Sequence, residues 1–325
     1  MLTDVLTDIR AWDTSTVDTP SSWFYTLPEA CLSTFEECIE IQRRSSQPIT
    51  ELPLQESLRD ACAESLQPVL TALNSGRGFA IVERVPVERY TVNDAQAMYW
   101  LIGQFLGIPF AQDIKGTLLY HVRDTGQNVA QGARFSVTNA ESSFHTDNSF
   151  GEPLPDFVGL LCLHEAKSGG QSQLISTYAL HNELLKNYPD LLKTLYHPFY
   201  FDRRGQFKAG ESLISHSPIF HWDGGQLTIR YMNYYIKVGH ERAGQPLSSD
   251  QQNALSTLEA LLQCPDFKVT FDLRPGQMLF TNNRCILHNR TAFEDYSEPE
   301  RRRHLVRLWL QRKEAELGFA ERGVQ

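Results

Sequence analysis

The sequence predicts one α+β domain, mainly β, over residues 1–325, with a layer of helices at 1–77 packed on a β core at 78–312. Three observations predict it. Helical periodicity is concentrated near the N-terminus. From about residue 117 onward the chain consists mostly of short β-type segments, which is typical of a barrel or sandwich. Finally, there is no composition shift that marks a linker and no internal repeat.

The N-terminal layer is predicted to contain three helices. Residues 29–46 have apolar positions at helical spacing and end in basic residues, which a helix dipole favours. A second helix at 55–75 ends at an Asn-Ser-Gly segment. A buried strand at 78–86 follows, and a third helix begins after a capping Thr91 and ends at Gly107.

The predicted core is a series of short strands rich in β-branched and aromatic residues. They are residues 117–123, 133–138, 157–166, 172–177, 217–231, 267–273, 276–282, 285–290 and 304–311. Helical stretches interrupt this series at 177–195 and 248–263.

Charge and composition exclude several classes of protein. The net charge of −9 and the isoelectric point near 5.6 disfavour a nucleic-acid-binding surface. No apolar run has the length that a membrane span or a signal peptide requires. The six cysteines are widely spaced without a Cys-x-x-Cys pair, so neither a zinc knuckle nor a disulfide framework is indicated. We therefore expect a soluble cytoplasmic protein with reduced thiols.

A histidine followed two residues later by a carboxylate occurs three times, and two of these pairs have simpler explanations. His181 and Glu183 lie in a predicted helix, where residues two apart point in different directions and cannot share an ion. In the pair of His221 and Asp223, the aspartate precedes two glycines and is expected to shape a hairpin turn.

The third pair, His145 and Asp147, lies where a strand is expected to run into a loop. On an extended backbone, residues two apart point to the same side. His288, near the end of the predicted strand 285–290, offers a third ligand. Two imidazoles and one carboxylate suit a non-haem Fe(II) oxygenase, but a zinc hydrolase could use the same set, so the residues alone leave both open.

The last predicted strand has two arginines among apolar residues. Alternation places Arg303, Leu305, Arg307 and Trp309 on one face. Buried arginines are costly unless they meet an anion. That anion is either an acidic side chain of this chain or the carboxylate of a ligand, which the planar guanidinium binds with two hydrogen bonds.

Four stretches together resemble one protein family. They are residues 144–150, 155–177, 276–293 and 301–310, in a match that extends from about Gly78 to Gln311. Their order of His-x-Asp, Gly-Gly-x-Ser, His and Arg is similar to that of the taurine dioxygenase and clavaminate synthase-like Fe(II)/2-oxoglutarate dioxygenases. The resemblance implies a double-stranded β-helix (jelly-roll) core with flanking helices.

The resemblance also implies an iron site and a reaction. His145, Asp147 and His288 match the family's Fe(II) ligands, with 2-oxoglutarate and O2 as co-substrates. Halogenases of the wider superfamily lack this carboxylate so that chloride can bind. Asp147 therefore favours hydroxylation, with desaturation or ring closure by the same oxidant as alternatives.

The same resemblance implies roles for Arg303 and Arg307. Arg303 matches the residue that binds the distal carboxylate of 2-oxoglutarate, and Ser172 matches a hydroxyl donor to that carboxylate. Arg307, four residues farther on, matches an arginine that contacts a substrate anion or lies near the co-substrate. Residues 293–300 form a looped-out insertion in this interpretation, and we rank Arg303 before Arg307.

The substrate is expected to be a small polar molecule such as a free or modified amino acid. We name Arg230, Asn233 and Arg134 as candidate contacts, the first two on a strand with tyrosines whose simplest role is packing. No nucleic-acid or membrane partner is expected, and a homo-oligomer is left open. The alternatives from other classes are a metal-dependent hydrolase or isomerase, and a binding protein without turnover.

Overall fold

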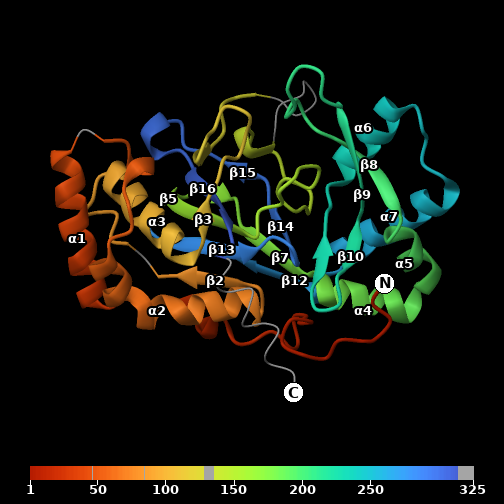
Figure 1. Cartoon of the computed structure of the whole chain (residues 1–325), viewed down its shortest axis with the longest axis horizontal. Helices are drawn as coiled ribbons and strands as arrows, with labels where there is room; N and C mark the ends of the chain where they lie inside the picture. Colours follow the sequence, from red (N-terminus) through yellow and green to blue (C-terminus); the bar gives the residue numbers. More distant parts are fainter. Residues whose placement is uncertain (46, 84, 128–134, 314–325) are drawn as a thin grey trace.

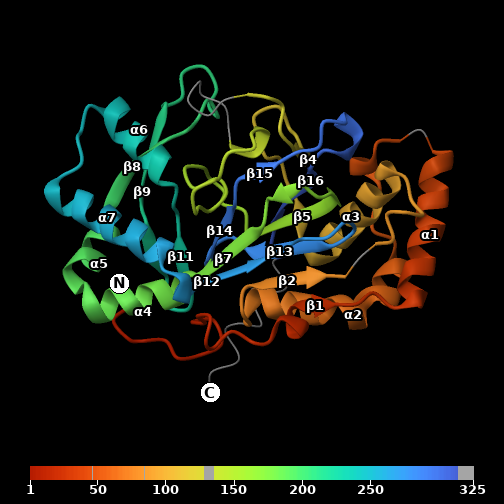
Figure 2. The same ribbon diagram turned by 180° about the vertical axis from the view of Figure 1, so that it is seen from behind.

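The computed structural model describes residues 1–45, 47–83, 85–127 and 135–313. Strands occupy the middle of the molecule, with one group of helices on each side (Figures 1 and 2). On one side lie α1 (Glu29–Arg44), α2 (Glu56–Asn74) and α3 (Val92–Leu106). On the other lie α4 (Thr177–Asn187), α5 (Pro189–Leu195), α6 (Asn233–Ala243) and α7 (Ser249–Gln263).

The larger sheet has seven strands in the order β1-β2-β13-β5-β16-β3, with β4 also paired to β16. Its strands are β1 (Phe24–Tyr25), β2 (Phe79–Val82), β3 (Ile108–Pro109), β4 (Leu119–Val122), β5 (Phe157–His164), β13 (Met278–Asn282) and β16 (His304–Gln311). The central strands β13, β5 and β16 are antiparallel neighbours, although they are far apart in sequence.

The smaller sheet has the order β12-β7-β14. It consists of β7 (Ser172–Ser176), β12 (Lys268–Phe271) and β14 (Ile286–Arg290). In the antiparallel register of β14 and β7, His288 lies opposite Leu174 and Arg290 opposite Ser172. An isolated bridge joins His145 to His288, so the loop before β5 is fixed to the edge of this sheet.

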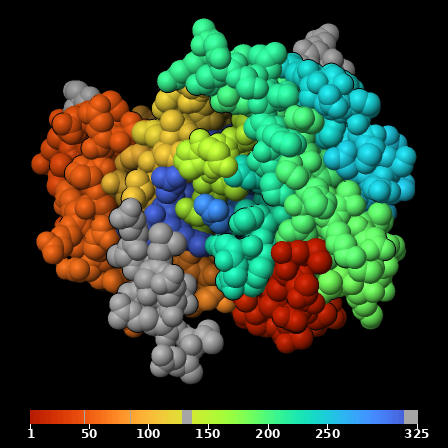
Figure 3. Space-filling view, turned by 45° about the vertical axis from the view of Figure 1, so that its right-hand side comes forward, coloured from red at the N-terminus to blue at the C-terminus, as the bar shows by residue number. Residues whose placement is uncertain are grey.

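Three short antiparallel pairs complete the strands. These are β6 (Ser168–Gly169) with β15 (Phe293–Glu294), β8 (Pro198–Asp202) with β9 (Ile214–Pro218), and β10 (Phe220–Trp222) with β11 (Leu227–Ile229). In the space-filling view, blue atoms of the C-terminal strands are visible between the orange-to-yellow and the teal parts of the surface (Figure 3).

The apolar core consists of two clusters, and the side chains of β16 alternate between them. Val306, Leu308 and Leu310 belong to the apolar cluster that α1, α2 and α3 cover, whereas Leu305 belongs to the second cluster. Helix α3 begins with a capping box between Thr91 and Asp94, as its sequence predicts. Gly103 lets this helix approach the sheet, because a Cβ there would lie 2.3 Å from Leu308 Cδ2.

Two sequence expectations about secondary structure were wrong. Within the predicted strand 133–138, Phe135–Val137 form a 3-10 turn, and residues 133–134 lie outside the described part. The strand that was expected to carry Asn233 ends before it, because Asn233 is the first residue of α6. Helices consequently occupy more of the described chain than strands do, so the fold is mixed rather than mainly β.

The expectation of reduced thiols also fails for one pair. Cys31 of α1 and Cys62 of α2 form a disulfide that links the two helices. Their separation of 31 residues gives no sequence motif, so the pairing depends on how the helices pack. Within the described residues, none of the helices is both long and apolar enough to cross a membrane.

Candidate active site

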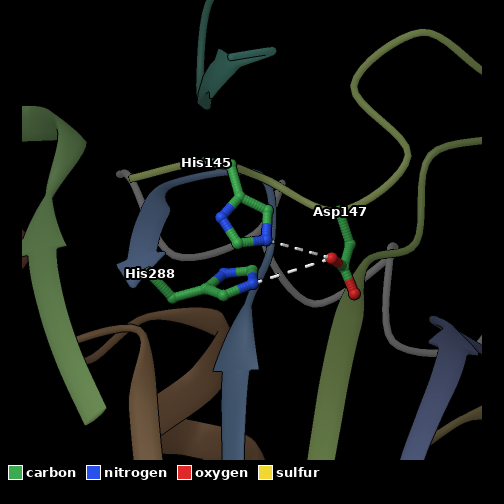
Figure 4. A group of neighbouring side chains, drawn as sticks. All are labelled: His145, Asp147 and His288. Carbon is green, nitrogen blue, oxygen red and sulfur yellow. Dashed lines mark ion pairs between the residues drawn. The ribbon is translucent and has the colours of Figure 1, made fainter. Parts of the chain in front are cut away.

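Three side chains converge at the edge of the smaller sheet (Figure 4). The Nε2 atoms of His145 and His288 lie 3.6 Å and 3.7 Å from the same oxygen, Oδ1 of Asp147. Each residue offers one ligand atom, and these atoms all lie within 4.8 Å of one another. Two imidazole nitrogens and one carboxylate oxygen at such distances are the donor set of a non-haem iron site.

The two histidines are aligned by the backbone. His145 and His288 exchange both backbone hydrogen bonds at 3.0 Å, and their rings are 4.3 Å apart. Nδ1 of His145 lies 2.8 Å from the carbonyl of Ser143. A proton on Nδ1 satisfies that carbonyl and leaves the Nε2 lone pair free for a metal, which is the usual second-shell arrangement.

Asp147 is held at both its backbone and its side chain. Its amide donates to Asn283 Oδ1 at 2.7 Å, and Asn283 Nδ2 donates back to its carbonyl at 3.0 Å. Trp309 Nε1 donates to Oδ2 at 2.7 Å, and Arg307 lies 3.1 Å from the same oxygen. Oδ1 is therefore the oxygen that faces the imidazoles.

The charge of Asp147 is stabilised by these neighbours. Burial alone would raise the pKa of its carboxyl, but the Arg307 cation and the imidazoles of His145 and His288 outweigh burial and hold the pKa well below its usual range. Burial, with the neighbouring His145, also lowers the pKa of His288. Both shifts favour the states that bind metal, which are an ionised carboxylate and a neutral imidazole.

Arg307 is fixed in this role by further contacts. Its Nε donates to Gln112 Oε1 at 2.7 Å, while Gln112 Nε2 donates to the Arg307 carbonyl at 2.8 Å. The guanidinium also lies over the rings of Tyr120 and Trp309. The anion that Arg307 contacts is thus Asp147, the proposed iron ligand.

Arg303 has a different environment. It is 5% exposed, and its NH1 atom has no hydrogen-bond partner. Burial lowers the pKa of its guanidinium to about 10. Gly170, with φ of +73°, makes room for it, because a Cβ there would lie 3.0 Å from Arg303 Nε. A buried cation with an unused hydrogen-bond donor is energetically costly unless the anion of a bound ligand accepts that hydrogen bond.

Arg303 and the triad share one cavity of about 90 Å³ between the two sheets. Ser172 and Leu174 of the smaller sheet line it together with Leu305 of the larger one. Ser172 is buried. Arg290 also lines the cavity, but its guanidinium donates to the carbonyls of Thr138, Ala140 and Thr291. Arg303 is therefore better placed than Arg290 to bind a carboxylate.

A second cavity, of about 70 Å³, adjoins two residues of the triad, His145 and Asp147. His145, Asp147, Arg307 and Trp309 form its inner end. Its outer lining includes Asn148, Phe150, Arg204, Gln206, Met232 and Tyr235. The metal ligands thus stand between two spaces, as a reaction that brings a co-substrate and a substrate to one ion requires.

The other sequence candidates lie elsewhere. Arg230 donates to the Gly151 carbonyl and forms an ion pair with Glu152. Neither Arg230 nor Asn233 lines the two cavities beside the triad. Arg134 lies outside the described residues.

The structure confirms why two histidine pairs were set aside. His181 is buried on α4, and its Nε2 lies 2.8 Å from the hydroxyl of Tyr196. Asp223 accepts from the amides of Gly225 and Gln226 and so shapes the predicted turn.

Sequence reasoning missed the residues that position Asp147. Asn283 falls between the predicted strands 276–282 and 285–290, and Trp309 was placed only on a strand face. Alternation placed Trp309 beside Arg307, which was a usable signal. Gln112 gave no signal, because it lies in a loop 195 residues before its partner Arg307.

Comparison with known proteins identifies one family and several relatives. A family model described as taurine catabolism dioxygenase TauD, TfdA family, matches residues 45–309. The FR-33289 synthase of Streptomyces rubellomurinus is 28% identical over 310 residues, which cover 94% of this chain and 90% of the relative. A uridine-5'-phosphate dioxygenase of Amycolatopsis is 31% identical over 177 residues, which cover 52% of this chain and 61% of the relative.

Solved structures show the same fold. Asparagine oxygenase in complex with Fe(II), 3-hydroxyasparagine and succinate superposes with a TM-score of 0.67 at 19% identity, covering 89% of this chain and 93% of the other. The non-haem iron oxygenase OrfP, in complex with iron and α-ketoglutaric acid, has a TM-score of 0.66 at 15% identity, with coverages of 90% and 95%.

Proposed function

This chain belongs to the TauD/TfdA family and is an Fe(II)/2-oxoglutarate-dependent dioxygenase, and we propose that it hydroxylates an unactivated C–H bond of a small polar molecule, such as a free or modified amino acid. One observation carries the assignment of the site. A buried arginine with an unused donor shares a cavity with a cluster of two histidines and one carboxylate.

In this proposal His145, Asp147 and His288 hold Fe(II), which together with 2-oxoglutarate and O2 supplies the oxidant that removes a substrate hydrogen atom. Arg303 binds the distal carboxylate of 2-oxoglutarate, and the Ser172 hydroxyl donates to the same carboxylate. Charged hydrogen bonds of this kind are stronger than neutral ones.

The remaining residues prepare the site. Trp309 donates to Oδ2 of Asp147, while Arg307 NH1 lies 3.1 Å from Oδ2 and 3.3 Å from Oδ1, so that the ionised carboxylate is held in place beside the metal position. Leu174, Leu279 and Leu305 line the same cavity and exclude water from the reacting centre.

The proposed substrate class has two supports. The second cavity adjoins the metal ligands His145 and Asp147. The fold is also that of oxygenases whose complexes hold 3-hydroxyasparagine and (3S)-hydroxy-L-arginine.

We further propose that the two sheets are the halves of a double-stranded β-helix within residues 78–312, and that 1–77 form its helical layer. The cavity lined from both sheets supports this arrangement. A cytoplasmic location and a homo-oligomer stay predictions.

The test is succinate formation from 2-oxoglutarate by the Fe(II)-loaded enzyme under air, with and without a panel of amino acids. We expect succinate in a reaction that requires both iron and O2, and a product heavier by one oxygen. A product lighter by two hydrogens would indicate desaturation or ring closure instead. Turnover of a panel compound without O2 consumption would support the hydrolase or isomerase, and iron binding without turnover the binding protein.

A further inference from the structure

The residue between two of the proposed iron ligands has a partner of its own. Thr146 is 2% exposed. Its amide donates to the carbonyl of Tyr231 at 3.0 Å, and the Tyr231 amide donates back to the Thr146 hydroxyl at 3.1 Å. The backbone and the side chain of Thr146 thus bind both polar backbone groups of Tyr231, which lies two residues after β11.

This pairing holds the segment 145–147 from the side opposite to β14. His145 exchanges both backbone hydrogen bonds with β14, and the Asp147 amide donates to Asn283, in the turn just before that strand. Successive amides of an extended chain point to opposite edges, so the Thr146 amide points away from β14. Without its partner there, the backbone of the segment would be held mainly from the β14 edge and could rotate about it.

The partner of Thr146 is itself fixed in the fold. Tyr231 is fully buried, and its hydroxyl donates to Glu259 of α7. Burial, together with the nearby Glu259 carboxylate, raises the pKa of Tyr231 well above its usual range, so the hydroxyl keeps the proton that it donates. The amides of Ile229 and Arg230 are also bonded to backbone carbonyls of other segments. Residues 229–231 therefore offer Thr146 a rigid support.

We propose that Thr146 is a positioning residue for the iron site, because its pairing with Tyr231 sets the direction in which His145 and Asp147 present their side chains. These two side chains converge with that of His288 (Figure 4). Thr146 is β-branched, and its few rotamers keep the hydroxyl in one place. Valine has the same shape but accepts no hydrogen bond, so it would leave the buried Tyr231 amide without this acceptor. The inference rests on the proposed iron ligands.

The experiment measures Fe(II) affinity by equilibrium dialysis without O2 and with saturating 2-oxoglutarate. Thr146→Val should weaken Fe(II) binding about 10- to 100-fold, the usual effect of losing a group that orients a metal ligand. Thr146→Ser keeps the hydroxyl and should bind Fe(II) nearly as the wild type does. Thr177→Val is the matched control, because the Thr177 hydroxyl is buried and has no hydrogen-bond partner among the described residues. It should leave Fe(II) affinity unchanged.

A second readout separates positioning from a purely structural role. It is the visible charge-transfer absorption of the Fe(II)–2-oxoglutarate complex, which depends on how the protein ligands surround the metal. At saturating iron the band should shift in Thr146→Val and stay in place in Thr146→Ser and Thr177→Val. Wild-type Fe(II) affinity in Thr146→Val, or equal losses in Thr146→Val and Thr146→Ser, would overturn the proposal. A lower unfolding temperature of the metal-free Thr146→Val protein with an unmoved band would also contradict it.

Tyr231→Phe tests the partner and keeps the proposal falsifiable if Thr146→Val does not fold. It removes the bond to Glu259 and should weaken Fe(II) binding by a smaller factor, so wild-type affinity in Tyr231→Phe would count against the proposal. In the double variant with Thr146→Val the two losses should not add, because both act through one contact. Additive losses would refute the pairing.

His145→Ala distinguishes a failure of the proposed iron ligands from a failure of this inference. It should lose Fe(II) binding, since it removes a ligand atom. Wild-type Fe(II) affinity in His145→Ala would refute the ligand set and the role of Thr146 together. Wild-type affinity in Thr146→Val, with binding lost in His145→Ala, would refute the role of Thr146 alone.

Discussion

Replacing Arg303 by glutamine should weaken 2-oxoglutarate binding steeply. The guanidinium is almost fully buried, and among the described residues its NH1 atom has no hydrogen-bond partner. A buried charged pair that loses one member typically costs about 2–5 kcal/mol. That range corresponds to a roughly 30-fold to several-thousand-fold weaker dissociation constant for 2-oxoglutarate. The same change should leave the ligand-free protein no less stable, because an unpaired buried charge is itself unfavourable.

The assay is succinate formation as a function of 2-oxoglutarate concentration, together with thermal unfolding of the ligand-free protein. Arg301→Gln is the control, since Arg301 is exposed and lies 3.7 Å from Glu298. A wild-type 2-oxoglutarate requirement in Arg303→Gln would refute the assigned role. A large loss of stability in the ligand-free variant would show instead that Arg303 is part of the structural core.

Four further expectations rest on single contacts. Ser172→Ala removes a neutral donor and should weaken 2-oxoglutarate binding by about 1 kcal/mol, measured in the same titration. Trp309→Phe removes the indole donor to Asp147 Oδ2 and leaves Arg307 to orient the carboxylate alone, so it should lower Fe(II) affinity about 10- to 100-fold while the protein stays folded, as equilibrium dialysis can show. His181 is buried and uncharged, with its pKa lowered to about 4 by burial. The unfolded chain therefore binds the extra proton first, and stability should fall by up to about 3 kcal/mol as the pH drops from about 6.5 to 4. A His181→Gln variant should show a smaller slope in chemical unfolding. With 18O2 and the true substrate, the product should gain one labelled oxygen with or without chloride, because Asp147 occupies the position that a halide needs; a chlorinated product would contradict this.

Local patterns predicted much of the secondary structure, and they selected the three side chains, His145, Asp147 and His288, that the fold brings together. The bounds of α2 and α3 follow from apolar periodicity and from the Thr91 cap, which act over a few residues. The alternation in β16 was confirmed, since Arg303, Leu305 and Arg307 line one cavity while Val306, Leu308 and Leu310 pack under the helices. The His145 and Asp147 pair was recognisable because neither a helix nor a turn signal explained it.

Long-range contacts were not predictable in the same way. The Cys31–Cys62 disulfide depends on how α1 and α2 pack, and the spacing of the cysteines in the sequence does not predict that packing. The β8–β9 pair and the turn with Arg204 were missed, since their residues have neither strict alternation nor a glycine-first turn signal. Arg230 looked like a substrate contact because its partner, Glu152, is 78 residues away and comes close only in the fold.

The order of residues along one face of β16 explains why the two arginines have different partners. Arg303 precedes the strand and faces Gly170, where β6 and β15 meet. The segment that begins at Phe293 is therefore not wholly looped out, as the sequence suggested, because its first residues pair with β6 and lead the chain back to Arg303. Arg307 lies four residues farther along, about 13 Å in an extended strand, and reaches Asp147 instead. Because side chains alternate, a shift of one residue in the pairing of β16 would turn Leu305 and Arg307 away from the cavity. The register with β5, in which Arg307 lies opposite Leu160, thus places Arg307 at Asp147 and leaves Arg303 for the co-substrate role that we propose.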